Sequence, residues 1–383
     1  MIDRRKFIIR CAQCTSAITA STFLDLGAFI PGGAESAVAG LPRAEDLSHV
    51  EARHYRKLDE LEVECGICPR KCRVSPLERG YCGTRENENG KYYTLVYSRP
   101  CSLNIDPIEK KPLFHFLPGT NAFSMATAGC NVNCKFCQNW NISQVRPEQV
   151  ENYLLTPDDI ARMAVSYDCP TIAYTYSEPV IFYEYMYDCS VKGHDNNVHS
   201  VAITGAYIMP EPLKELLDAL DGVKVDLKAF SEDFYRDYVR GELQPVLDAI
   251  KIIHNQQKWL ELVYLVIPTL NDKEDEMKRM CNWISRELSP DVPLHLTRFH
   301  PMYLMKNLPS TPRDTLFKLH EIAREAGLNY VYIGNVPGNK YEHTYCPQCG
   351  KILIERYGYR LGERNITDSR CKFCDTKIPG VWA

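Results

Sequence analysis

The stretch "MATAGCNVNCKFCQNW", residues 125–140, places Cys130, Cys134 and Cys137 in a C-x3-C-x2-C run directly after an apolar strand pattern. An iron–sulfur cluster that only transfers electrons takes four cysteine ligands. Three thiolates in one loop would leave one iron of a four-iron cluster open, and an open coordination position is where a metal site admits substrate. Phe136, beside the last cysteine, is expected to shield the cluster from water. The loop therefore predicts a catalytic metal centre.

The segments around this loop alternate strand and helix patterns. We expect strands at residues 122–128, 171–177, 200–204, 223–228, 261–268, 294–299 and 330–335. Thr156 and Pro157 have the sequence pattern of a helix start, and Thr311 and Pro312 repeat it before a helix that Gly327 closes. Apolar strands separated by amphipathic helices favour a parallel sheet with right-handed crossovers. The predicted fold is α/β, a partial TIM-type barrel whose chemistry gathers at the carboxyl ends of its strands.

Composition excludes several classes of protein. With 383 residues, 45% hydrophobic and 25% charged, the chain is globular rather than disordered or fibrous. A net charge of -4 provides no basic field, so we expect no nucleic-acid partner. Apolar runs are strand-sized, so we expect no membrane span. The 17 cysteines are clustered, and tight C-x2-C pairs in a chain of this size favour metal thiolates over disulfides.

Two further groups contain four cysteines each. The first, in "CGICPRKCRVSPLERGYCG", comprises Cys65, Cys68, Cys72 and Cys82. These four soft ligands are enough to close a metal site, and both zinc and iron–sulfur remain open. The second, in "CPQCG" and "CKFCD", comprises Cys346, Cys349, Cys371 and Cys374. Its paired knuckles have a spacing close to that of zinc ribbons and predict a structural zinc.

The first 39 residues have the pattern of an export signal. Two arginines in "DRRKFI", residues 3–8, precede an apolar stretch and a small-residue Ala37-x-Ala39 site, which indicates a twin-arginine signal peptide. Its processing would place the protein in the periplasm, and an unprocessed chain would be cytoplasmic. We therefore expect four parts: the signal at 1–39, a Cys-rich segment at 40–118, the barrel at 119–340 and a zinc-ribbon-like module at 341–383.

The cysteine loop resembles the signature of radical S-adenosylmethionine (SAM) enzymes, with an aromatic residue before the last cysteine. This resemblance implies a [4Fe–4S] cluster whose open iron holds SAM and whose electron cleaves it to a 5'-deoxyadenosyl radical. "DPIEKKPLFHFLPG", "YTYSEP", "VKVDLKAF", "HLTRFHP" and "CPQCGKILIER" are similar to the AmmeMemoRadiSam-system enzymes, relatives of pyruvate formate-lyase activating enzyme. The likeness covers most of the chain from about Cys65.

By this resemblance, seven residues bind SAM. Those implied are Ser177 and Glu178 for its amino group, Thr204, Asp226 and Lys228 for its methionine moiety, His295 for its carboxylate and Val266 for its adenosine. A carboxylate, an ammonium group and a histidine at strand ends suit a zwitterionic amino acid. Structural alternatives stay open, because Glu178 could cap a helix and Asp226 could pair with Lys228. Gly205 stands where relatives have Asn, which removes one polar contact, and Ser177 replaces a small Gly.

The resemblance also suggests what the enzyme acts on. Activating relatives abstract hydrogen from a glycine of a partner enzyme, and the AmmeMemoRadiSam name implies Memo-type and AMMECR-type partners. A flavodoxin or ferredoxin is the expected reductant. The alternative function is a non-catalytic, multi-cluster iron–sulfur electron carrier. Such a carrier would ligate every iron with protein, so the three-cysteine loop argues against it.

Overall fold

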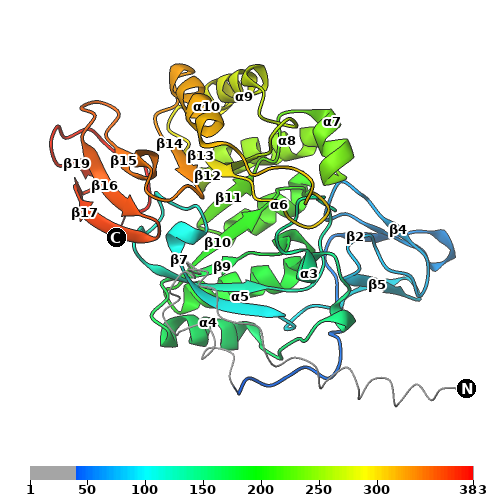
Figure 1. Ribbon diagram of the computed structural model, residues 1–383. Helices are drawn as coiled ribbons and strands as arrows, with labels where there is room; N and C mark the ends of the chain where they lie inside the picture. The colour runs from blue at the N-terminus through cyan, green and yellow to red at the C-terminus, as the bar shows by residue number, and fades with distance from the viewer. Residues whose placement is uncertain (1–39, 383) are drawn as a thin grey trace, which may run out of the picture. The chain divides into compact units, whose positions relative to one another are not determined.

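An eight-stranded, mostly parallel sheet forms the centre of the computed structural model, which describes residues 40–382. Seven strands run parallel in chain order, and β7 pairs antiparallel with β8 at one edge (Figure 1). The strands are β7 (Ser102–Pro107), β8 (Asn121–Ala126), β9 (Thr171–Tyr174), β10 (His199–Thr204), β11 (Gly222–Asp226), β12 (Trp259–Val266), β13 (Leu294–Arg298) and β14 (Val331–Gly334). Within residues 40–382 no pairing joins β7 to β14, so the sheet is open.

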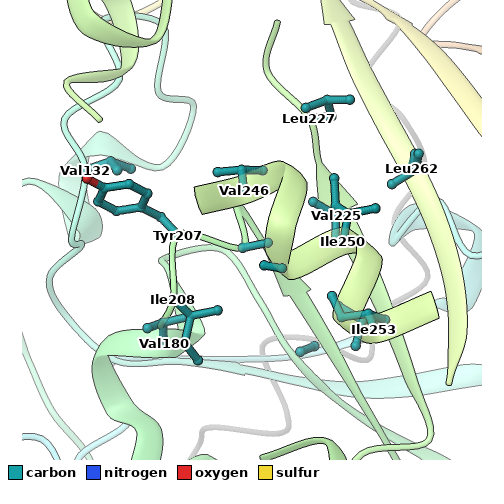
Figure 2. Close-up of a cluster of buried hydrophobic side chains, with 14 of the residues drawn as sticks. Val132, Val180, Tyr207, Ile208, Val225, Leu227, Val246, Ile250, Ile253 and Leu262 are labelled. Carbon is teal, nitrogen blue, oxygen red and sulfur yellow. The ribbon is translucent and has the colours of Figure 1, made fainter. Parts of the chain in front are cut away.

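Helices connect the parallel strands, as right-handed crossovers require. They are α3 (Trp140–Ser143), α4 (Pro157–Ser166), α5 (Tyr183–Asp195), α6 (Pro210–Asp218), α7 (Glu232–Phe234), α8 (Leu243–Asn255), α9 (Glu274–Glu287) and α10 (Arg313–Glu325). Figure 2 shows Val246, Ile250 and Ile253 of α8 in one buried cluster with Val225 of β11 and Leu262 of β12. Burial of these apolar side chains stabilises the layers at roughly 25 cal/mol per Å². The predicted α/β class and parallel central sheet are confirmed.

Two local expectations are wrong. The second predicted strand ends at Tyr174 rather than at residue 177, because Tyr176 adopts a φ of +66° that breaks extended structure. Thr311 does not cap α10, whose capping residue is Pro312 without a side-chain bond. The Thr311 hydroxyl instead donates to the Val266 carbonyl at 2.6 Å and ties the ends of β12 and β13 together. Tertiary bonding therefore overrides the local capping signal.

Two small antiparallel sheets precede the central one. They have the orders β2-β3-β4 and β1-β6-β5. Their strands are β1 (Val50–Glu51), β2 (Tyr55–Lys57), β3 (Val63–Cys65), β4 (Arg73–Val74), β5 (Arg85–Glu88) and β6 (Lys91–Thr94). Cys65 ends β3, and its amide donates to the Cys72 carbonyl at 3.0 Å. The sequence pattern missed these strands because each is too short to show a period.

The C-terminal segment consists of short hairpins. Its strands are β15 (Thr344–Tyr345), β16 (Ile352–Tyr357), β17 (Arg360–Arg364), β18 (Ile366–Thr367) and β19 (Arg370–Cys371). The amides of Leu117 and Val381 bond to the carbonyls of Val381 and His115 at 2.7 Å each. Phe116 packs on His199 and Gly222, which begin β10 and β11, so this segment meets the amino ends of the strands.

Residues 40–382 lie within a single compact unit. The expected domain boundaries at residues 118 and 340 therefore remain predictions. The expected signal peptide, residues 1–39, lies outside the described residues. Among the helices that the structure describes, none is both long and apolar enough to cross a membrane.

Candidate functional site

The candidate site lies at the carboxyl ends of the parallel strands. We call this region the rim and define it as residues 126–139, 174–178, 204–209, 226–231, 266–273 and 298–312, the ends of β8 to β13 with the start of each following loop. Parallel strands bring all of these segments to one edge of the sheet. In α/β folds, ligands bind at this edge.

The three-cysteine loop follows β8 and is held on both sides. The Asn133 amide donates to the Val239 carbonyl at 3.0 Å, and Cys137 Sγ lies 3.1 Å from the hydroxyl of Ser143. Phe136 is buried and packs on Phe234, with ring centroids 5.8 Å apart, as its predicted shielding role requires. The loop is therefore a fixed set of three sulfur ligands. Burial raises the pKa of Cys134 to about 12, because the charged thiolate is poorly solvated there.

Glu178 is buried beside this loop. Its carboxylate accepts bonds from the Thr204 hydroxyl, from the Gly205 amide at 2.8 Å and from the Val180 amide at 3.3 Å. Burial raises the pKa of Glu178 above its usual range. The bond to Val180 realises the helix-capping alternative, yet the other two bonds tie Glu178 to the end of β10.

A row of alternating charges ends β11. Lys224 donates to the Asp226 carboxylate, and Lys228 Nζ lies 3.9 Å from it. Burial opposes ionisation of Asp226, but the two lysines lower the pKa of its carboxyl below the usual range. Burial also disfavours the charged Lys228, yet Cys134 and Asp226 raise the pKa of its ammonium group. The predicted Asp226–Lys228 pair is thus in contact, and Lys228 ends this row of charges at the rim.

Lys224 was not among the predicted site residues, although a signal for it exists. In "VKVDLK" the residues 224, 226 and 228 alternate with apolar ones, and period-two alternation places all three on the same face of a strand. Reading that alternation would have identified Lys224 as the buried partner of Asp226, with 4% of its surface exposed.

Ser177 and Val266 also lie at the rim. The Ser177 hydroxyl donates to the Thr127 carbonyl at 2.7 Å, which fixes the loop after β9 to the loop after β8. Val266 is fully buried and ends β12. The structure therefore brings six of the seven predicted SAM-binding residues to one region: Ser177, Glu178, Thr204, Asp226, Lys228 and Val266.

His295 is not part of this group. It is the second residue of β13, and its ring is bonded to the buried Glu261 carboxylate at 2.7 Å, near the amino ends of the strands. Glu261 also accepts bonds from the amides of Phe114 and His115. Desolvation lowers the pKa of His295 despite this carboxylate. His300 is the histidine at the carboxyl end of β13, and it is exposed.

The two groups of four cysteines differ in spacing. In the C-terminal group, Cys346 Sγ lies 3.5 Å from Cys374 Sγ, and Cys349 Sγ lies 3.8 Å from Cys371 Sγ. All four sulfurs lie within 4.8 Å of one another, so this group can hold one metal ion. Among residues 40–382, no three of Cys65, Cys68, Cys72 and Cys82 gather this closely.

Comparison with known proteins defines the class. The family model for the radical SAM superfamily matches residues 125–281. An uncharacterized protein of Methanocaldococcus jannaschii is 46% identical over 330 residues, covering 86% of this chain and 98% of its own. Pyruvate formate-lyase-activating enzyme of Clostridium pasteurianum is 21% identical over 212 residues, covering 51% of this chain and 87% of its own. A radical SAM methyltransferase structure from Sphaerobacter thermophilus aligns with a TM-score of 0.46 and 16% identity, covering 62% of this chain and 71% of its own.

Residues 125–281 of the chain form a radical SAM superfamily domain, and members of this superfamily are generally enzymes. The chain also shares a family with the Methanocaldococcus protein, which it matches along nearly the whole length of that relative. The superfamily domain implies a [4Fe–4S] cluster and SAM.

The residues at the rim fit these two groups. Three cysteines without a fourth in the same loop suit a cluster with one open iron. The Thr127 hydroxyl and the side-chain oxygen of Asn131 are buried at the same loop without a hydrogen-bond partner. Such atoms normally have partners, so their orphaned state indicates a polar ligand. A Cβ on Gly205 would lie 3.3 Å from Glu178 and 3.5 Å from Lys228, so glycine keeps open the space between them.

Proposed function

We propose that the chain reductively cleaves SAM and uses the product radical to abstract hydrogen from a partner protein, in the manner of an activating enzyme. The observation that carries this proposal is that Cys130, Cys134 and Cys137 follow β8 at the same rim at which Glu178 and Lys228 lie on either side of Gly205. When bound, the reduced cluster and SAM supply a 5'-deoxyadenosyl radical, which abstracts the hydrogen atom.

The residues of the chain bind and orient SAM. Glu178 is held by Thr204 and Gly205 so that its carboxylate can receive the amino group through charge-assisted hydrogen bonds. Lys228 is kept cationic beside Asp226 and Cys134, and it offers a positive charge to the carboxylate of SAM. Phe136 and Val266 exclude water from the reacting centre.

The test is anaerobic turnover. Protein reconstituted with iron and sulfide, then given dithionite and SAM, should form 5'-deoxyadenosine, and Cys134→Ala should form none. Cys101→Ala is the matched control, because Cys101 precedes β7 outside all three cysteine groups and should keep turnover. A well-formed cluster that yields no 5'-deoxyadenosine, even with candidate partner proteins, would overturn the proposal in favour of the electron-carrier alternative.

The partners and location belong to the same proposal. Memo-type and AMMECR-type proteins are the hydrogen donors to try first, and a flavodoxin or ferredoxin is the reductant. Export through the twin-arginine route is tested by N-terminal sequencing of the mature protein. A start at Gly40 would support export, and a start at Met1 would contradict it.

A further inference from the structure

The N-terminal cysteine region, residues 63–94, touches the radical SAM loop through backbone atoms. Gly129, directly before Cys130, has a φ of +99°, and a Cβ there would lie 2.8 Å from the Cys82 carbonyl oxygen and 2.5 Å from Thr84. Glycine is therefore required at this position, both for its backbone conformation and for its space. The backbone beside one loop cysteine thus meets the backbone of a cysteine of the second group.

Further bonds connect the N-terminal cysteine region to the rim. The Met209 amide donates to the Ile67 carbonyl at 2.9 Å, between Cys65 and Cys68. The Arg70 guanidinium donates to the backbone carbonyl of Asn131, which follows Cys130. In each of these contacts, a residue that lies close in sequence to an N-terminal cysteine bonds to a residue of the rim. The region is therefore built onto the rim at several points.

The four cysteines line one cavity, and rim residues complete its wall. Asn131, Val180 and Ile181 line it together with Tyr92 of β6. The Tyr92 hydroxyl is buried without a hydrogen-bond partner, and Tyr92 is only 1% exposed. A buried hydroxyl without a partner is costly, so a group bound among the cysteines is expected to satisfy it.

The spacing of the sulfur atoms distinguishes a site for a single metal ion from a site for an iron–sulfur cluster. Zinc binds sulfur at about 2.3 Å, so its four sulfurs must crowd together, as those of the C-terminal group do. No three of the N-terminal sulfurs meet that condition within residues 40–382, and neither do those of Cys130, Cys134 and Cys137. The N-terminal cysteines thus share the wider spacing of the loop that the superfamily domain assigns to a cluster.

The sulfurs already receive polar contacts. The Tyr81 amide donates to Cys72 Sγ at 3.5 Å, and Cys82 Sγ lies 3.2 Å from the Thr84 hydroxyl. Arg85 is buried in the cavity wall and bonds to Glu184 at 2.6 and 2.8 Å. Hydrogen bonds to sulfur and nearby charge are the means by which a protein sets the potential of an iron–sulfur cluster.

We propose that Cys65, Cys68, Cys72 and Cys82 ligate a second iron–sulfur cluster, one with every iron bound by protein, which passes electrons to the loop cluster. A low-potential electron-carrier protein loses one electron, the second cluster carries it, and the loop cluster gains it, with no proton or leaving group moving. Cys72 is partly exposed while Cys65 and Cys68 are buried and Cys82 adjoins Gly129 of the rim, so electrons enter on the side of Cys72. The existence of this cluster is independent of the proposed function, whereas its role as donor depends on it.

Metal analysis tests the site directly. Reconstituted full-length protein in which Cys130, Cys134 and Cys137 are all replaced by Ala should keep about four irons and four sulfides per chain, with the EPR signal of a reduced cluster. A second zinc per chain in its place, beside the one expected in the C-terminal group, or no iron while the circular dichroism spectrum stays that of the wild type, would overturn the proposal. The reciprocal variant, Cys72→Ala with Cys82→Ala, should keep the loop cluster alone.

Turnover with two reductants tests the role. With a reduced flavodoxin as donor, the Cys72→Ala, Cys82→Ala variant should form 5'-deoxyadenosine at least about tenfold more slowly than the wild type. With dithionite, which reaches the loop cluster without a protein donor, it should still form product. An equal rate with flavodoxin would overturn the donor role. Wild-type protein that forms no product with either reductant would overturn the proposed function and leave the metal analysis valid.

Discussion

The two groups of four cysteines use the same ligands at opposite ends of the sheet. The N-terminal cysteine region packs on the rim, where Cys82 meets Gly129 and Arg70 bonds to Asn131. The C-terminal segment instead meets the amino ends of the strands, where Arg356 donates to the Phe114 carbonyl at 2.7 Å. One group is spread around a cavity and the other is gathered within 4.8 Å.

This difference shows that ligand type alone does not decide what a metal site does. A tight group on short hairpins can bind one ion and stabilise a segment that has little core of its own. A wide group beside the catalytic loop can hold a larger, redox-active cofactor. Location and spacing, rather than the number of cysteines, assign the roles proposed here.

Removing one ligand from the C-terminal group should have the largest effect on folding. Cys374→Ala should lose the one zinc per chain that we predict for this group and make residues 341–382 sensitive to protease, because structural zinc supplies about 10 kcal/mol or more of folding free energy. Iron content and 5'-deoxyadenosine formation should stay at wild-type levels. Metal analysis with limited proteolysis measures this, and iron lost together with zinc would show that the two regions are not separable.

Substitution at the amino ends of the strands should affect stability rather than SAM binding. His295→Ala leaves the buried Glu261 without its imidazole partner and should lower the free energy of unfolding by about 3 kcal/mol. His300→Ala is the control at the rim end of β13, where the exposed side chain contributes little to stability. Denaturant unfolding and SAM titration of both variants give the answer. A normal stability with lost SAM binding in His295→Ala would restore its predicted cofactor role.

Substitution of one glycine in each region tests how tightly the backbone packs there. Gly129 contacts the N-terminal cysteine region, and Gly350 lies in the C-terminal segment. Gly129→Ala should destabilise the protein by about 3 kcal/mol, because the new methyl group meets Cys82 and Thr84 at a positive φ. Gly350→Ala, in the C-terminal segment, has a φ of +71° but open space around it, so backbone strain of about 1 kcal/mol is expected. Equal melting temperatures for the two variants would contradict the close contact at Gly129.

The smallest effect should come from one hydroxyl. Tyr92→Phe removes the buried, unpartnered hydroxyl in the cavity wall and should lower the reduction potential of the second cluster, because the hydrogen bond that this hydroxyl would donate to the bound cluster cannot form. Tyr93→Phe is the control, since that ring stacks on His49 and does not line the cavity. Redox titration followed by EPR measures both, and an unchanged potential in Tyr92→Phe would exclude contact with the cluster.

Much of the fold could be predicted from the sequence because apolar strand patterns and helix starts are local. All seven parallel strands lie within a few residues of their predicted places, and Thr156 caps α4 as expected. The predicted helix cap at Thr311 was wrong because the Thr311 hydroxyl donates to the carbonyl of Val266, a residue 45 positions away. The motif around His295 predicted a position at the rim, but His295 lies near the amino end of β13. A strand pattern spans several residues, and it does not show which of them reaches the carboxyl end.

The sequence by itself determined which side chains carry the chemistry. The sequence contains the spacing of Cys130, Cys134 and Cys137 and the paired cysteine knuckles at the C-terminus. These spacings are set by the covalent chain and can be recognised without knowledge of the fold. Only the tertiary structure decided where these groups meet. The wide spacing of the N-terminal sulfurs, their contact with Gly129 and the burial of Lys224 beside Asp226 arise from packing between distant segments, and short-range patterns contain no information about it.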